Sequence, residues 1–309
     1  MKKKIIATGL SGLVGSRIAQ LLGKKYNFVN FGLETGIDIT DFNLLKQKFA
    51  EHLDADLVFH LAAFTDVNAA WEQMEKTEDK KNTLCYKVNV IGSKNIARLS
   101  NQFNKYLIHI STDFVFNGDK SFSDCYQEED KPDPIEWYGY TKYLAEKEVN
   151  KSGCKHVILR IAFPFKAKPA PEIIEPKIKL DLVRKMIQKL KNNDQLSLFV
   201  DQKITPTFID DIVKALEECI EDKPQGIFHC VGSTSISPYD LAGKVADVFN
   251  LPKKNIIKTK LADFLKNHPH DRPRQVNLSL SNKKIEKQLG IEMMGLEDAL
   301  KLMKKQLVS

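Results

Sequence analysis

The chain has 309 residues, of which 42% are hydrophobic and 28% are charged. These values are typical of folded globular proteins and exclude collagen, coiled coils, small disulfide-stapled scaffolds and wholesale disorder, while the length allows one large domain or two. The 47 basic and 40 acidic side chains give a net charge of +7, but the lysines are dispersed in short runs, so we expect no nucleic-acid partner.

The start of the chain and its cysteines indicate the compartment. No apolar run approaches the ~18 residues that a membrane helix needs, and Gly9 comes too early for the apolar segment of a signal peptide. The five cysteines lie far apart without a C-x-x-C pair, which is typical of reduced thiols and provides no zinc framework. We therefore expect a cytoplasmic protein with no membrane partner and no metal site.

The first 161 residues alternate between apolar strands and helices. Residues 4–8 form a short apolar strand, and after a run of glycines the apolar residues from Leu13 to Leu22 have helical spacing. The pattern then repeats, with strands expected near 28–31, 57–61, 106–111 and 156–161 and helices near 42–52, 86–103 and 137–151. This alternation predicts an α/β fold with a doubly wound parallel sheet that helices cover on both faces.

The pattern changes after residue 163. Four prolines fall between 164 and 176, before a helix near 179–191 and a strand at 196–200. A helix at 209–221 and a strand at 227–230 return to the main sheet, and 235–309 look mainly helical. We therefore predict a main domain of residues 1–163 and 204–234 and a smaller, discontinuous domain of 164–203 and 235–309, with a ligand cleft between them.

Three glycines follow the first strand directly. Gly9, Gly12 and Gly15 give the pattern T-G-x-x-G-x-x-G at the start of the first helix. Glycines let the backbone turn tightly and approach a diphosphate, whose charge meets the free amides and the positive end of the helix. The context of first strand, turn and helix predicts a dinucleotide site.

The second strand leaves the choice of dinucleotide open. Its end, 30–33, has neither an acid for a ribose hydroxyl nor an arginine for a 2′-phosphate, and Glu34 lies past the expected strand. NAD and NADP are therefore both possible. Asp38 and Ile39, just before the next helix, are candidates for contact with adenine, and a simple turn and helix cap at Thr40 or Asp41 is the alternative.

A tyrosine and a lysine share one face of the helix at 137–151. Tyr138 and Lys142 are four residues apart, which suits acid–base chemistry, and an adjacent ammonium together with a cationic nicotinamide is expected to lower the tyrosine's pKa from ~10 towards ~7. Tyr143 and Lys147 form a second such pair. We prefer the first, because it opens the helix near the carboxyl edge of the sheet, where the strand ending in Thr112 could supply a hydroxyl.

These residues resemble the extended short-chain dehydrogenase/reductase family, in the family's order and approximate spacing. Its branch of dTDP-4-dehydrorhamnose reductases is the most similar, on the segments 38–41, 111–118, 201–207 and 272–278. The resemblance implies a Rossmann dinucleotide-binding domain, a smaller substrate domain and an NAD(P)H-dependent reductase of a nucleotide-activated 4-keto-6-deoxy sugar. Its partner is a nucleotide-sugar substrate, and a homodimer is possible.

The resemblance also assigns site residues. The catalytic residues are Thr112, Tyr138 and Lys142, with the tyrosine as proton donor, and the substrate contacts are Thr112, Asp113 and Phe163. The cofactor, NADP or NAD, is expected at Tyr138 and Lys142 and at Gly9, Ser11, Gly12, Leu13, Val14, Gly15, Asp38, Ile39, Leu61, Ala62 and Ala63. His60 and His109 lie in apolar strands and are expected to be buried and hydrogen-bonded rather than catalytic.

Some positions depart from the branch's pattern and keep other functions open. Phe114 stands where related 4,6-dehydratases have a glutamate, which disfavours a dehydratase. Asn68, Trp71, Phe163 and the proline-rich segment 164–177 depart from the reductases and leave the sugar undecided. An NAD-dependent nucleotide-sugar epimerase and a non-catalytic dinucleotide-binding regulatory subunit are the alternatives.

Overall fold

The computed structural model describes residues 2–167 and 180–308, and the chain divides into two compact units. The first consists of Met1–Asn117, Lys131–Arg160 and Val213–Phe228, and the second of Gly118–Asp130, Ile161–Ile212 and His229–Ser309. This division groups 118–130, 161–163, 204–212 and 229–234 with the second unit, whereas the sequence-based boundaries had them in the main domain. The binding roles expected of the two domains stay predictions.

A six-stranded sheet forms the centre of the first unit, in the order β10-β5-β4-β3-β1-β2. Strands β1 to β4 pair in parallel, with Thr8 opposite His60 and His60 opposite His109. The strand order reverses between β1 and β3, so the predicted doubly wound sheet is confirmed and its switch point lies there. The strands are β1 (Lys4–Thr8), β2 (Asn27–Phe31), β3 (Leu57–His60), β4 (Tyr106–Thr112), β5 (His156–Ile161) and β10 (Gly226–His229).

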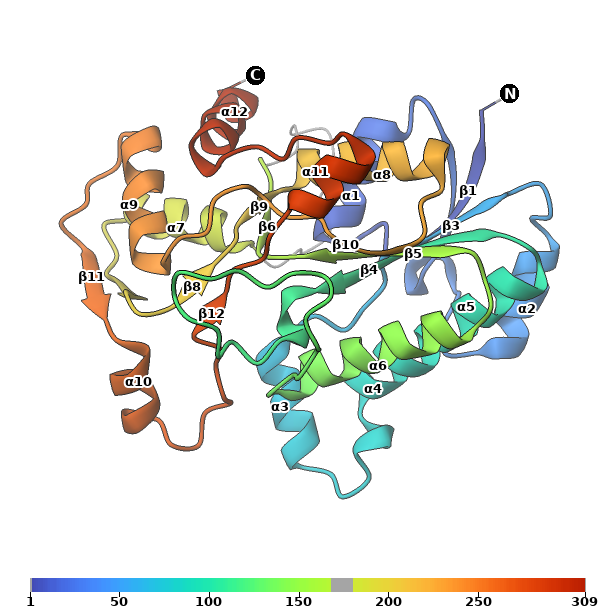
Figure 1. Ribbon diagram of the computed structural model, residues 1–309, viewed down its shortest axis with the longest axis horizontal. Coiled ribbons are helices and arrows are strands. Elements are labelled where there is room, and N and C mark those ends of the chain that lie inside the picture. Colours follow the sequence, from blue (N-terminus) through green and yellow to red (C-terminus); the bar gives the residue numbers. More distant parts are fainter. Residues whose placement is uncertain (1, 168–179, 309) are drawn as a thin grey trace. The chain divides into compact units, whose positions relative to one another are not determined.

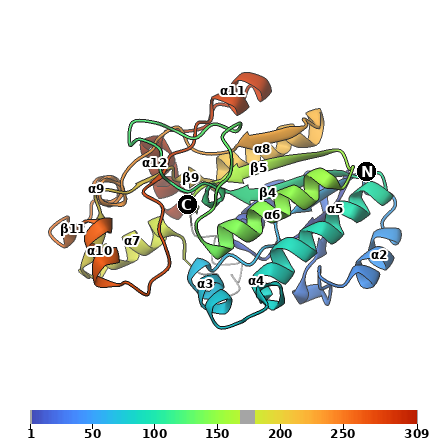
Figure 2. The same ribbon diagram turned by 60° about the horizontal axis from the view of Figure 1, so that its bottom comes forward.

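Helices cover both faces of this sheet (Figures 1 and 2). One face carries α1 (Leu13–Leu22) and α8 (Ile209–Asp222), and the other carries α2 (Phe42–Ala50), α5 (Ser93–Gln102) and α6 (Trp137–Lys151). The helix expected at 86–103 is divided into α4 (Leu84–Tyr86), a π-helical turn (Lys87–Gly92) and α5, and α3 (Val67–Glu75) was not expected. The core on the α2 and α5 face includes Ile6, Val58, Leu107, Phe49 and Ile96, all fully buried.

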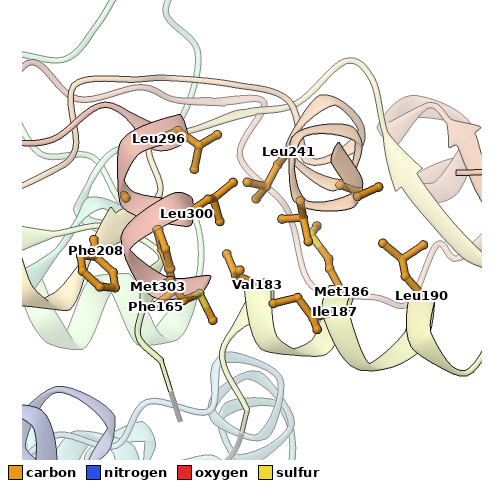
Figure 3. Close-up of a cluster of buried hydrophobic side chains, with 14 of the residues drawn as sticks. Phe165, Val183, Met186, Ile187, Leu190, Phe208, Leu241, Leu296, Leu300 and Met303 are labelled. Atoms are coloured by element: carbon orange, nitrogen blue, oxygen red, sulfur yellow. The ribbon is translucent and has the colours of Figure 1, made fainter. Parts of the chain in front are cut away.

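The second unit has an apolar core of its own (Figure 3). Helices α7 (Leu182–Lys191), α9 (Pro238–Phe249) and α12 (Leu296–Val308) surround it, and Val183, Leu241 and Leu300 point into it from the three helices. Short parallel pairs join β7 (Leu196–Phe199) to β11 (Ile256–Thr259), β8 (Lys203–Ile204) to β12 (Asn277–Leu278) and β6 (Pro164–Phe165) to β9 (Thr207–Phe208). The remaining helices are α10 (Leu261–Asn267) and α11 (Lys283–Leu289). Over the residues described, no helix is long and apolar enough to cross a membrane.

Candidate active site

The glycine turn after β1 is tight and closely packed. Gly9 has a φ of +73°, and a Cβ added there would lie 2.6 Å from the backbone nitrogen of Ala62, beyond the end of β3. A Cβ on Gly15 would lie 2.2 Å from the carbonyl oxygen of Gly9, so α1 can approach the turn only because residue 15 is glycine. The first and third glycines therefore serve the tight turn and the close helix packing that the pattern predicts.

The start of α1 is suited to an anionic group. Gly12 is the N-cap and has no side chain to occupy the free amides, and the first turn of the helix contains no acidic residue. Ser11 and Gly12 are exposed, and Leu13 and Val14 are half-buried at the first positions of the helix. Helix N-termini with free amides bind phosphates. The residues present therefore fit the diphosphate of a dinucleotide.

A buried polar chain joins β1 to β3 below the turn. The hydroxyl of Thr8 lies 2.8 Å from Nδ1 of His60, whose Nε2 lies 2.8 Å from the hydroxyl of Ser93, and Thr8 also accepts the backbone N–H of Ala62 at 3.1 Å. Burial lowers the pKa of His60 to about 3. The expected buried and hydrogen-bonded state is thus found for His60. His109 is buried too, but its ring nitrogens have no partner among the described residues.

The other predicted cofactor residues follow β3 or precede α2. Leu61, Ala62 and Ala63 are half-buried and follow β3. Asp38 is exposed and accepts hydrogen bonds from the backbone and the hydroxyl of Thr40, at 2.8 and 2.9 Å. Ile39 is buried against the bare backbone of Gly92, and Asp41 rather than Thr40 caps α2. The contact of Asp38 and Ile39 with adenine stays a prediction.

Thr112, Tyr138 and Lys142 come together where β4 ends and α6 begins. Glu136 caps α6 by accepting the N–H groups of Tyr138 and Gly139 at 2.8 and 2.5 Å, which holds the first turn of the helix beside the strand end. The phenol of Tyr138 lies beside the hydroxyl of Thr112, and Lys142 donates its ammonium to the carbonyl oxygen of Ile110 at 2.7 Å. All three predicted catalytic side chains are buried within the first unit.

Burial sets the charge states of this group. It raises the pKa of Tyr138 well above the ordinary value, although the hydroxyl of Thr112 beside it opposes the shift, and it lowers the pKa of Lys142 to about 8 against the attraction of Glu146. The expectation that the tyrosine's pKa falls towards 7 is therefore not met by the protein alone. Neutral tyrosine and charged lysine are the forms expected at neutral pH.

Asp113 is the buried acid of this site. Its Oδ1 accepts the hydroxyl of Thr112 at 3.0 Å, while its Oδ2 has no hydrogen-bond partner among the residues described. Burial raises the pKa of Asp113 to about 7. The structure thus has an incompletely satisfied carboxyl group beside Thr112, and its predicted contact with a substrate stays a prediction.

Phe163 lies in the second unit rather than with these residues. It has a φ of +41°, packs against the apolar core of that unit, and its carbonyl oxygen accepts the N–H of Thr207 at 3.4 Å. Its role in substrate binding also stays a prediction. Most of the proline-rich segment at 164–177 lies outside the described residues.

The second tyrosine and lysine pair lies nearer the surface of α6. Lys147 is exposed and its ammonium lies 5.0 Å from the centre of the half-buried ring of Tyr143. The two side chains thus contact each other in a cation–π pair, whereas Tyr138 and Lys142 are buried against the sheet. The two pairs therefore differ in burial as well as in direction around the helix.

A buried ion pair that the sequence analysis missed supports the site. Arg160 on β5 donates from Nε and Nη2 to the two carboxylate oxygens of Glu146 at 2.9 and 2.8 Å, and the hydroxyl of Ser111 donates to the same carboxylate at 2.6 Å. Glu146 lies one helical turn beyond Lys142, so the pair fixes α6 to the strands that carry the site. An acid four residues after a lysine gives only a weak signal in the sequence.

The chain was compared with known proteins. The family model described as RmlD substrate binding domain matches residues 3–309. A probable low-salt glycan biosynthesis reductase of Haloferax volcanii is 28% identical over 306 residues, which cover 95% of this chain and 94% of the relative. The beta subunit of methionine adenosyltransferase 2 of Rattus norvegicus is 26% identical over 82% of this chain and 74% of its own length. A solved structure of dTDP-4-dehydrorhamnose reductase from Bacillus anthracis in complex with NADP is similar at a TM-score of 0.84 and 25% identity, with 99% of each chain covered.

Proposed function

The chain belongs to the RmlD substrate binding domain family, and on that premise we propose that it is an NAD(P)H-dependent reductase of a nucleotide-activated 4-keto-6-deoxy sugar. The observation that carries the proposal is the burial of Thr112, Tyr138 and Lys142 together where β4 ends and α6 begins, with the ammonium of Lys142 held on the carbonyl oxygen of Ile110 at 2.7 Å. Because β1 and β4 run in the same direction, this group shares one edge of the sheet with the glycine turn.

The glycine turn and Lys142 are the parts that would hold the dinucleotide. The free amides at the start of α1 would receive the diphosphate, and the ammonium of Lys142 would donate to the nicotinamide ribose. When bound, the reduced dinucleotide supplies the hydride that the carbonyl carbon of the sugar accepts. The pKa of Lys142 is about 8, so the ammonium is charged at neutral pH.

Tyr138 is the proton donor in this proposal. Its raised pKa keeps the phenol protonated at neutral pH, and reduction of a ketone needs a donor that still holds its proton when negative charge develops on the substrate oxygen. Thr112 lies beside the phenol, and its hydroxyl favours the phenolate form. Phe114, with its ring 5.7 Å from that of Tyr138, has no titratable group, so this position offers no base for a dehydratase.

The proposal is tested by the oxidation of NADH and of NADPH, followed at 340 nm with an enzymatically generated dTDP-4-keto-6-deoxy sugar. We expect turnover by the parent and a loss of about 10²-fold to 10⁴-fold in Tyr138→Phe, with dinucleotide affinity nearly unchanged. Tyr143→Phe is the matched control and should keep the parent's rate. Equal rates in Tyr138→Phe and the parent would contradict the role of this tyrosine.

A non-catalytic dinucleotide-binding subunit is the second candidate, because one relative is a subunit of methionine adenosyltransferase 2. Binding of the dinucleotide in calorimetry without oxidation of it by any 4-keto sugar would favour this candidate. An epimerase would instead purify with its cofactor and need no added hydride donor.

The assembly and location of the protein are part of the same proposal. A homodimer is one possible assembly, and size-exclusion chromatography with light scattering would distinguish it from a monomer. A cytoplasmic location is expected as well, and cell fractionation that recovers the protein elsewhere would contradict it.

A further inference from the structure

The carboxylate of Glu34 lies at the carboxyl end of β2, next to the glycine turn. Glu34 belongs to a short 3-10 turn (Leu33–Thr35) that follows the strand, and its Oε1 accepts the amide of Asn30 at 2.8 Å. Ser11 in the glycine turn lies near enough to the same carboxylate to help lower the pKa of Glu34. The side chain therefore connects the end of β2 with the turn after β1, although Glu34 itself comes three residues after the strand.

The backbone around Glu34 holds the carboxylate in this place. A Cβ added to Gly32 would lie within 2.5 to 2.8 Å of the carboxylate atoms, so the acid folds back over a position that has no side chain. The hydroxyl of Thr35 donates to the carbonyl oxygen of Asn30 at 3.0 Å and accepts the N–H of Gly32 at 3.2 Å. Gly36 then turns the chain away with a φ of +73°. These contacts hold the 3-10 turn in one conformation.

The position and charge of Glu34 suit the adenosine ribose of an unphosphorylated dinucleotide. It comes 19 residues after Gly15 (34 minus 15), and an acid about 20 residues beyond the glycine pattern accepts hydrogen bonds from the ribose 2′-hydroxyl in dinucleotide-binding folds. Asn30–Asp41 contains three acids, Glu34, Asp38 and Asp41, and no lysine or arginine. A 2′-phosphate next to this segment would therefore meet negative charges and no basic side chain of the segment.

We propose that Glu34 makes this protein select NADH over NADPH, by accepting a hydrogen bond from the ribose 2′-hydroxyl and repelling a 2′-phosphate. The inference rests on the proposed function, since it deepens the choice of cofactor that the sequence left open. It also separates this chain from the Bacillus anthracis reductase, whose structure contains NADP.

The test measures binding without any sugar, by titrating NADH and NADPH separately into the full-length protein and following nicotinamide fluorescence or heat. We expect NADH to bind at least about tenfold more tightly than NADPH at low salt, since like charges at close range are strongly unfavourable. Because Glu34 is exposed, this ratio should shrink as the salt concentration rises.

Glu34→Gln is the decisive variant, because glutamine retains an oxygen that can accept from Asn30 but carries no charge. It should reduce the preference for NADH over NADPH about tenfold, chiefly by tightening the binding of NADPH. Glu72→Gln, at an exposed surface ion pair with Lys76, is the control and should leave both affinities as in the parent. NADPH binding as tight as NADH in the parent, or a ratio that Glu34→Gln does not change, would overturn the inference alone. Binding of neither dinucleotide would overturn the proposed function with it.

Discussion

Removal of the charge of Glu146 is expected to weaken the fold and the site together. Glu146 and Arg160 have side chains that are 2% and 1% exposed, and their two hydrogen bonds at 2.8 and 2.9 Å satisfy both carboxylate oxygens. The guanidinium also lies 5.1 Å from the centre of the Phe116 ring. In Glu146→Gln the glutamine accepts one of these hydrogen bonds, and the charge of Arg160 stays buried without a counter-ion.

The magnitude follows from that burial. Loss of one partner of a buried ion pair costs about 3–5 kcal/mol of unfolding free energy, a large part of the ~5–15 kcal/mol that stabilises a typical protein. Urea unfolding followed by circular dichroism would measure the loss. Glu297→Gln is the matched control, because Glu297 and Lys301 form a half-exposed pair at 2.8 Å and such pairs contribute only ~0–1 kcal/mol. A loss below about 1 kcal/mol in Glu146→Gln would refute the reasoning.

The same substitution should change the pH dependence of turnover. Lys142 is charged below its pKa of about 8, so kcat/KM is expected to fall as the pH rises through that value. The negative charge of Glu146 raises the pKa of Lys142, and its removal lowers that pKa further. The alkaline limb of the pH profile should therefore move to lower pH in Glu146→Gln. A limb at the same pH in both proteins would show that the two groups are not coupled.

Three further predictions concern the glycine turn, a buried histidine and the second core. Gly15→Ala, whose Cβ would lie 2.2 Å from the carbonyl oxygen of Gly9, should weaken dinucleotide binding at least about tenfold in calorimetry, whereas Gly243→Ala, with open space at its Cβ, should not. Burial holds the pKa of His109 well below 6.5, so the unfolded chain takes up a proton there as the pH falls from 7 to 5 and the folded chain does not. Between pH 7 and pH 5 this difference should lower the parent's unfolding free energy by about 2 kcal/mol. His109→Leu should lose about 2 kcal/mol less over the same range in urea unfolding, and an unchanged loss would contradict the prediction. Leu300→Ala, at a fully buried position of the second unit, should lower the unfolding free energy by about 2–5 kcal/mol, and a loss below ~1 kcal/mol would mean that the core can collapse around the cavity.

The alternating part of the fold could be predicted because each element there carries its own pattern. The helix at 137–151 and the strand at 156–161 have the predicted bounds, since their apolar residues repeat locally and a polar turn separates them. The helix expected at 86–103 is interrupted for a reason that lies elsewhere in the chain. Asn89 in the π-helical turn bonds to the backbone of Phe64 and to Thr141 on α6, and no periodicity within 86–103 records those partners.

The short strands of the second unit could not be predicted for a similar reason. β8 and β12 contain two residues each and pair across more than seventy residues of sequence. Two residues are too few for an alternating pattern, and such strands exist only because a distant segment offers its backbone groups. Helix α3 could not be predicted either, because only one of its nine residues, Ala70, is buried, and one buried residue gives no repeating apolar pattern.

Within the site, sequence spacing predicted which residues share a face and could not predict what burial does to their charges. Tyr138 and Lys142 were recognised from their spacing, but the direction of the tyrosine's pKa shift depends on how deeply α6 packs against β4. Glu34 lies beyond the expected strand, so its position in the sequence does not assign it to the ribose. Its carboxylate returns to the strand end through a turn that requires Gly32 and Thr35 together, and no single position indicates that geometry.

The site as a whole depends on the register of three strands. Thr8, His60 and His109 lie in one row across β1, β3 and β4, so the glycine turn begins one residue beyond that row and Thr112 lies three residues beyond it. A slip of one residue between β3 and β4 would displace Thr112 by about 3.3 Å along the strand, which is longer than a hydrogen bond can tolerate. The spacing between the glycine turn and Thr112 therefore depends on this register. All seven residues of β4 are buried, so a slip would turn each side chain to the opposite face and require both packed faces to rearrange.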